Sequence, residues 1–115
     1  MSKRSLELLV EDIWESIGKI ERYTEGMTQE VFQSDEKTTD AVVRNLEIIG
    51  EAAGRLPKDF TDKHSKVEWV KIKGLRNRIV HEYFGVDIQI IWQILNKDLP
   101  AFKASLKSIR AQLDS

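Results

Sequence analysis

Residues 67–84 read VEWVKIKGLRNRIVHEYF, and this stretch decides both the fold class and the candidate site. Large apolar residues recur in it at spacings of three and four, the period of an amphipathic helix. The pattern predicts a helix over residues 67–84, with Gly85 as its C-terminal cap. At about 100° per residue, one stripe of this helix carries Trp69, Ile72, Arg76, Ile79 and Tyr83.

Arg76 is the one charged residue on this otherwise apolar and aromatic stripe. An unpaired charge buried there would cost several kcal/mol, so it needs an acidic partner or a cleft. Glu47 and Glu51 of the preceding predicted helix are candidate partners. A cleft would instead leave the guanidinium free to bind phosphate oxygens with its planar fork.

A second stripe of the same helix is small and polar, and it contains Val70, Gly74, Asn77 and His81. A glycine inside a helix costs about 1 kcal/mol relative to alanine, which predicts that a backbone, a partner chain or a ligand comes close to Gly74. Histidine exchanges a proton near neutral pH, and Asn77 could fix its tautomer or bind phosphate. These residue types suit phosphodiester chemistry. Their spacing alone equally fits a histidine stabilised by the dipole at a helix C-terminus.

Helical periodicity also dominates outside this stretch, and no segment sustains the period of two that a strand requires. The seam of the second long helix is formed by Val42, Leu46, Ile49, Ala53 and Leu56. Caps and breakers predict helices from Ser5 to about Tyr23, around Glu30 to Phe32, from Ser34 or Asp35 to Gly54, from Asp87, and from Asp98 onward, with a polar loop at 57–66. The chain is therefore expected to be an all-α, up-and-down bundle of four to five helices, in a single domain over residues 1–115.

The overall charge is nearly balanced, with a formal net charge of −1 over 115 residues. One window departs from this balance, because residues 63–78 hold six basic residues and one acid. Lys71, Lys73 and Arg78 in this window could extend a phosphate footprint, although a solvated lysine face explains them equally well.

Several classes of protein and site are not indicated by the sequence. There is no cysteine to form a disulfide, no cluster with metal-ligand spacing and no glycine-rich phosphate loop. The N-terminus has acids where a signal peptide needs an apolar run, and no segment is apolar enough to span a bilayer. We expect a cytoplasmic protein without a bound metal, cofactor or membrane anchor.

The flanking residues carry a family resemblance. Residues 67–100, VEWVKIKGLRNRIVHEYFGVDIQIIWQILNKDLP, resemble the core signature of the HepT-like family in the HEPN superfamily, and residues 40–57, DAVVRNLEIIGEAAGRLP, resemble its second-helix segment. The family motif R-x4-H-x-Y matches Arg76, His81 and Tyr83, with Asn77 directly after the arginine. The resemblance extends over nearly the whole chain.

This resemblance implies a homodimeric, metal-independent endoribonuclease that acts as the toxin of a toxin–antitoxin pair. It implies that the two motifs of the dimer face one cleft, with Arg76, Asn77 and His81 as catalytic residues. The implied antitoxin is an MntA-like minimal nucleotidyltransferase that transfers AMP to Tyr83. The alternatives are a non-catalytic helical subunit that positions a substrate or nucleotide for such a nucleotidyltransferase, and a purely structural helical dimer.

Overall fold

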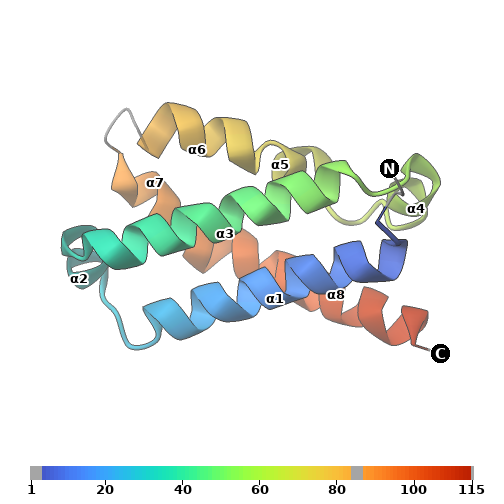
Figure 1. The fold of residues 1–115 in the computed structure, drawn as a ribbon, viewed down its shortest axis with the longest axis horizontal. Helices are drawn as coiled ribbons and strands as arrows, with labels where there is room; N and C mark the ends of the chain where they lie inside the picture. Colours follow the sequence, from blue (N-terminus) through green and yellow to red (C-terminus); the bar gives the residue numbers. More distant parts are fainter. Residues whose placement is uncertain (1–3, 84–86, 115) are drawn as a thin grey trace.

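The computed structural model of the chain describes residues 4–83 and 87–114, without the side chains of residues 80–83. The described residues form eight α-helices and one π-helical turn. Their bounds are α1 Leu6–Thr24, α2 Gln29–Ser34, α3 Glu36–Gly54, α4 Lys58–Lys63, α5 Trp69–Lys73, α6 Leu75–Tyr83, α7 Ile88–Gln93, η1 Ile94–Asp98 and α8 Leu99–Leu113. Figure 1 shows four rods along the length of the molecule, each antiparallel to the one before it: α1, α3, α5 with α6, and α7 continuing into α8. The predicted all-α class is confirmed.

Local sequence signals explain where the first helices begin and end. The hydroxyl of Ser5 accepts a hydrogen bond from the Leu8 amide at 3.3 Å, and the Asp35 carboxylate accepts one from Thr38 at 3.1 Å. Each bond satisfies an amide that has no partner within its helix. Gly26 follows α1 with φ of +75°, a conformation that favours glycine. These caps agree with the predicted helix starts at residues 5 and 35.

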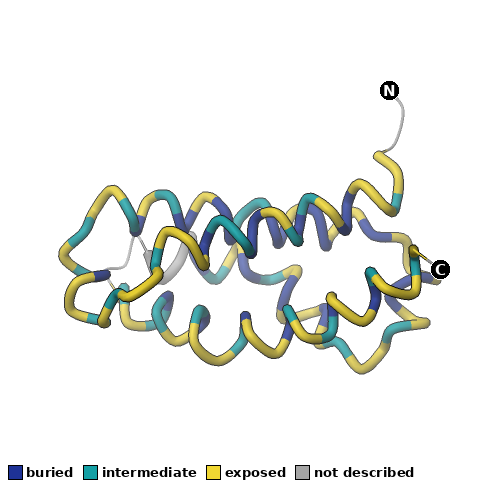
Figure 2. The backbone as a smooth tube through the Cα atoms, turned by 90° about the horizontal axis from the view of Figure 1, so that it is seen from below, coloured by how far each residue is buried: buried dark blue, intermediate teal, exposed yellow. Residues whose placement is uncertain are grey.

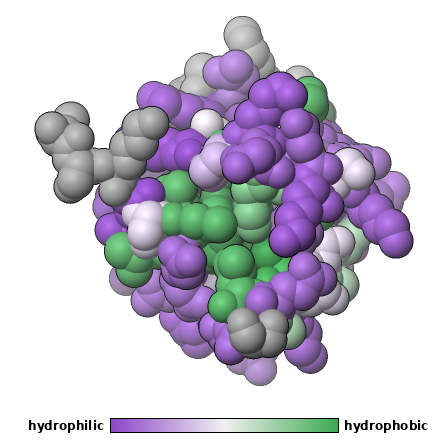
Figure 3. Space-filling view, turned by 90° about the vertical axis from the view of Figure 1, so that its right-hand side faces the viewer, coloured by the Kyte–Doolittle hydropathy of each residue, from purple (hydrophilic) through white to green (hydrophobic). Residues whose placement is uncertain are grey.

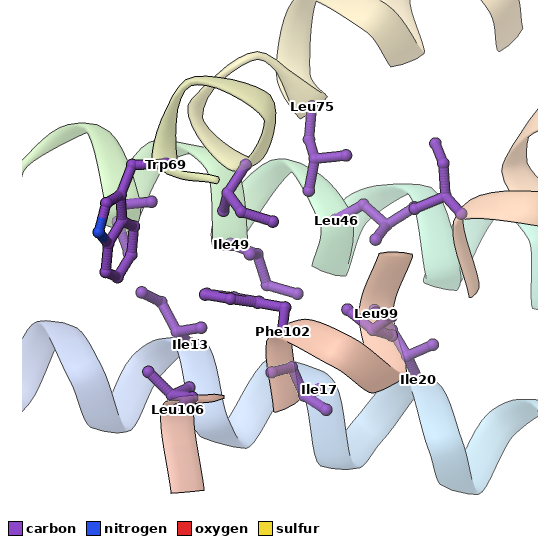
Figure 4. Packing of buried hydrophobic residues seen from close by; sticks show 14 of the residues in the cluster. Ile13, Ile17, Ile20, Leu46, Ile49, Trp69, Leu75, Leu99, Phe102 and Leu106 are labelled. Carbon is purple, nitrogen blue, oxygen red and sulfur yellow. The ribbon is translucent and has the colours of Figure 1, made fainter. Parts of the chain in front are cut away.

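The core lies between the four rods and consists mainly of branched aliphatic side chains. α1 packs most extensively on α3, and isoleucines of α1 meet the predicted seam of α3. In Figure 4, Phe102 of α8 lies in the middle of this layer, between Ile49 and Ile17. Each fully buried side chain of this size contributes roughly 1.5–3 kcal/mol. Figure 2 shows that buried residues lie on the inner side of each helix and exposed residues on the outer side.

One predicted boundary is wrong. The segment 57–66, predicted to be a loop, contains helix α4, which buries Phe60 and Thr61. The predicted helix start at Asp98 agrees with α8, which begins at Leu99 with Asp98 as its N-cap, although the π-helical turn η1 joins α8 directly to α7. Pro100 lacks an amide hydrogen and its ring crowds the carbonyl of the preceding turn, so a wider turn at this point relieves the conflict.

One end of the bundle combines an apolar centre with a hydrophilic rim. Figure 3 looks onto the end where α4 and the C-terminal end of α8 lie, and there apolar side chains gather at the centre inside a hydrophilic ring. Among the described residues, no helix combines the length and the apolar character that crossing a membrane would require.

Candidate functional site

Two short helices, α5 and α6, carry most of the candidate residues, and they meet at Gly74. Gly74 ends α5 with φ of −77° and ψ of −5°, and α6 starts at the next residue. The sequence predicted one continuous helix over 67–84, so this joint is a correction. Part of that prediction, and the proposed cap at Gly85, falls on residues 84–86, outside the described residues.

The joint changes which residues of α6 face the core. Leu75 and Ile79 are each 1% exposed, whereas Arg76 is exposed to solvent. Figure 4 shows Leu75 directed toward the seam residues of α3. The predicted stripe from Trp69 through Arg76 assumed an unbroken helix. The turn at Gly74 alters the rotation, so that leucine, not arginine, occupies the inner position.

Arg76 is therefore not a buried charge held by an acid. Among the described side chains, no carboxylate forms an ion pair with it, and the candidate partner Glu51 binds Arg55 at 2.9 Å instead. The other candidate, Glu47, is half-buried on α3 and makes no ion pair with a described residue. Arg76 thus presents, on the surface of α6, a guanidinium that no described side chain compensates and that is available to an anion.

Gly50 of α3, a residue that the sequence did not single out, allows the α5–α6 joint to pack closely against α3. Gly50 is buried, and a Cβ built on it would lie 3.3 Å from the amide nitrogen of Arg76 and 3.4 Å from the carbonyl oxygen of Ile72. A glycine inside the helix, one position after the seam residue Ile49, is the signal that could have revealed this contact. For Gly74, the nearest such contact is its own preceding turn, at 3.2 Å from the Val70 carbonyl oxygen. Among the described residues, a close approach of another helix backbone is therefore found at Gly50 and not at Gly74.

Two of the three basic residues predicted to touch phosphate are held by one carboxylate. Asp98 binds Lys71 at 2.9 Å and Arg78 at 3.4 Å, and its side chain is only 19% exposed. The hydrogen bond and the charge of Asp98 raise the pKa of Lys71 above its ordinary value of 10.5. Asp98 ends the π-helical turn, so it joins η1 to both sides of the Gly74 joint. Sequence spacing gave no indication of this contact across 20 residues.

The other motif residues differ in how fully they are described. Asn77 and Lys73 are exposed, and neither makes an ion pair or side-chain hydrogen bond with a described residue. The backbones of His81 and Tyr83 belong to α6, but their side chains lie outside the described residues. By helical spacing, position 81 lies one turn beyond Asn77, and position 83 lies two turns beyond Arg76 on the same side of α6.

The second histidine of the chain, His64, is half-buried. Its ring stacks at a tilt on Phe60 with 4.7 Å between centroids, and its carbonyl oxygen accepts a bond from Trp69 Nε1 at 3.0 Å. Burial, together with the charge of Lys63, lowers the pKa of His64 below its ordinary value of 6.5. These contacts give His64 a structural role at the start of α5.

Polar groups that could hold a cofactor or metal are sparse in the described part of the chain. No three histidine, aspartate or glutamate side chains gather there in a metal-binding group. Asn45 of α3 is buried; its Nδ2 donates to the Ala41 carbonyl at 2.9 Å, and its Oδ1 has no partner among described residues. The arrangement offers a free guanidinium and an amide on one exposed helix, followed by a histidine and a tyrosine.

Comparison with known proteins shows which family the chain resembles. A protein-family model described as "Ribonuclease HepT-like" matches residues 13–109. A "Probable ribonuclease HepT" of Thermococcus cleftensis is 40% identical over 108 residues, covering 94% of this chain and 98% of the relative. A "Putative RNase" of Caldanaerobacter subterraneus subsp. tengcongensis is 49% identical over 90 residues, covering 78% of this chain and 80% of the relative.

A third relative has a second activity in its name. It is the "Gamma-glutamylcyclotransferase and putative RNase" of Methanocaldococcus jannaschii, 35% identical over 112 residues, which cover 97% of this chain and 50% of that protein. No solved structure matches the chain significantly.

Proposed function

Because the chain belongs to the HepT-like ribonuclease family, we propose that it is the toxin of a toxin–antitoxin pair. In this proposal it is a homodimeric endoribonuclease that needs no metal, and a minimal nucleotidyltransferase neutralises it. Arg76, Asn77 and His81 form the catalytic group, and Tyr83 receives AMP.

The observation that carries the proposal is the contrast between two arginines on the same helix. Arg78 is neutralised by Asp98, whereas Arg76, the arginine of the family motif, has no acidic partner among the described residues. A surface arginine without a partner is unremarkable alone, but here it occupies the motif position, next to Asn77 and one and a half turns before His81. This combination supports a site for a phosphate group.

The proposed reaction is attack of a ribose 2′-oxygen on the adjacent phosphorus. The bond from phosphorus to the 5′-oxygen breaks, leaving a 2′,3′-cyclic phosphate and a 5′-hydroxyl. One imidazole takes the proton of the 2′-hydroxyl, and another gives a proton to the departing 5′-oxygen. Arg76 binds the phosphate oxygens and stabilises the negative charge that develops on them, while Asn77 orients the site.

A dimer would supply the second imidazole, because the chain has one histidine at the motif. His64, the other histidine, is held at the far end of α5 against Phe60. Two motifs facing one cleft would allow His81 of one subunit to act as base and that of the other to act as acid. This division of roles is the reason that the proposal requires a homodimer.

Modification of Tyr83 offers a direct means of control. Positions 76 and 83 lie on the same side of α6, which is continuous from Leu75 to Tyr83. An AMP group on Tyr83 would add a negative phosphate close to Arg76 and a bulky nucleoside at the cleft. The phosphate would compete for the guanidinium that the RNA requires.

Expression of the chain alone tests the proposal. We expect growth arrest and RNA breakdown with the wild-type chain, relieved by His81→Ala and Arg76→Ala and by co-expression of the nucleotidyltransferase. Circular dichroism and sedimentation of both variants should remain those of the wild type. Arrest that persists undiminished in His81→Ala would refute catalysis by this residue, and a harmless wild-type chain that binds the nucleotidyltransferase would favour the non-catalytic subunit.

A further inference from the structure

A groove runs along α8 on the side where the α4–α5 segment and α5 pack against it. It consists of two adjoining hollows of about 280 and about 390 Å³, which share Lys66, Val67 and Ser105. The first hollow extends toward Asp98 at the end of η1, and the second extends toward Gln112 near the end of α8. We call this continuous depression the α5–α8 groove.

Lysines from separate segments converge on the groove. Lys63 and Lys66 come from the segment before α5, Lys71 from α5, and Lys97 from η1. The sequence showed a basic window at residues 63–78, but it did not show that Lys97 joins part of this window. The chain as a whole has a net charge of −1, so this concentration of cations is local.

Acids in the groove neutralise only part of this charge. The acidic side chains that line it are Glu68 and Asp98, and both lie within ion-pair distance of Lys71. Lys63, Lys66 and Lys97 are exposed and form no ion pair with a described residue. Three cations therefore remain available to an anionic ligand.

The other groups in the groove suit a nucleic acid strand. Ser65, Ser105 and Ser108 offer hydroxyls that can bind phosphate oxygens or a ribose 2′-hydroxyl. Between them lies Val67, which is half-buried and can contact a sugar, while the buried Phe102 and Ile109 form the apolar floor. Grooves that bind single strands without sequence preference follow the phosphate backbone with positive charge, which the lysines supply here.

The groove also borders the motif helix. Asp98 lines its end and at the same time binds Arg78, which is two residues beyond Arg76 on α6. We infer that the α5–α8 groove is an accessory binding site for the phosphate backbone of single-stranded RNA, beyond the bond that is cut. This inference rests on the proposed ribonuclease function, and it adds the surface that holds the rest of the substrate.

Replacing lysine by glutamine, which removes the charge and keeps a side chain of similar size, tests the site. Lys66→Gln with Lys97→Gln removes two groove cations, and Lys37→Gln with Lys107→Gln removes two exposed lysines outside it, the second on the opposite face of α8. The probe is a fluorescent, 2′-O-methylated RNA of about 12 nucleotides, within the usual site sizes for single strands. Because its 2′-oxygens are blocked it cannot be cut, and its affinity is measured by anisotropy over a series of salt concentrations.

Each lost phosphate contact lowers the slope of log affinity against log salt by about 0.7 for single strands. The groove variant should therefore lose about 1.4 in slope, which corresponds to about 25-fold weaker binding at about 0.1 M salt when extrapolated from 1 M. The control variant should bind as the wild type does. Equal affinity of the groove variant and the control variant would overturn the inference, as would displacement of the RNA by polyglutamate of equal charge at equal concentration.

The outcome separates the groove from the catalytic proposal. RNA binding that depends on Lys66 and Lys97, in a chain that cuts no RNA, would support the groove and refute the ribonuclease assignment. Cleavage of RNA by a chain whose binding is unaffected by the two substitutions would support the ribonuclease and refute the groove. Circular dichroism of each double variant confirms that the comparison is made between folded proteins.

Discussion

Gly50 allows a sharp test of how the motif helix is held against the bundle. Replacing it with alanine would place a Cβ 3.3 Å from the Arg76 amide nitrogen and 3.4 Å from the Ile72 carbonyl oxygen. Both atoms belong to the backbone of the α5–α6 joint, so no flexible side chain can move aside. The joint itself must shift by a few tenths of an ångström.

The expected magnitude follows from two opposing effects. Alanine in place of glycine inside a helix stabilises by about 1 kcal/mol, whereas overpacking a filled contact costs about 1–3 kcal/mol. Gly54 of the same helix is a matched control, because a Cβ there meets nothing within 4 Å and its φ is not positive. Gly54→Ala should raise the free energy of unfolding by about 0.5–1 kcal/mol, and Gly50→Ala should fall about 1–3 kcal/mol below it.

Urea unfolding followed by tryptophan fluorescence provides the measurement, with all proteins at one concentration because assembly adds to apparent stability. The difference between the two variants should also appear as a gap in Tm on the order of 5 °C per kcal/mol. Gly50→Ala as stable as Gly54→Ala would refute the close approach of α3 to the joint. The wild-type midpoint provides the common reference.

Three further results are expected. Asp98→Asn should lower the pKa of Lys71, which the ion pair raises in the folded chain. The ion pair stabilises the fold below pH 10.5, and this stabilisation is lost as the pH rises through the folded pKa. Urea midpoints of the variant should therefore fall less at alkaline pH than those of the wild type, and an equal fall would count against the Lys71–Asp98 pair. His64 should titrate below pH 6.5 by NMR, and titration at or above 6.5 would contradict its burial. Because its pKa is lowered in the folded chain, the free energy of unfolding should fall as the pH drops below 6.5. His64→Gln should reduce that fall. Co-expression with the nucleotidyltransferase should add the mass of AMP to the wild-type peptide that contains Tyr83, and should add nothing to the same peptide of Tyr83→Phe. A wild-type peptide that stays unmodified would refute Tyr83 as the AMP acceptor.

The helical seams could be predicted from the sequence because they depend on periodicity alone. Leu46 and Ile49 of α3 lie in the core as their spacing indicated. The helix starts at Ser5 and Asp35 followed from side chains that bind their own helix. These are local effects, and the sequence contains all that determines them.

The site was harder to predict because it depends on rotation and on distant contacts. The turn at Gly74 rotates α6 so that Leu75 enters the core and Arg76 faces solvent, and a wheel drawn through 67–84 could not include that turn. The pairing of Asp98 with Lys71 and Arg78 joins segments that only the fold brings together. Arg76 remains the central candidate for a different physical reason than the sequence suggested, namely its exposure without an acidic partner in the described part of the chain.

The most direct test of the account compares two arginines two residues apart in a single assay. Purified wild type, Arg76→Ala and Arg78→Ala are incubated with a single-stranded RNA under single-turnover conditions, without added metal. The account predicts that the wild type cuts the RNA, that Arg76→Ala cuts it about 10²–10³-fold more slowly, as for loss of one group that stabilises the transition state, and that Arg78→Ala is much less affected. Equal cleavage by Arg76→Ala and the wild type would contradict it.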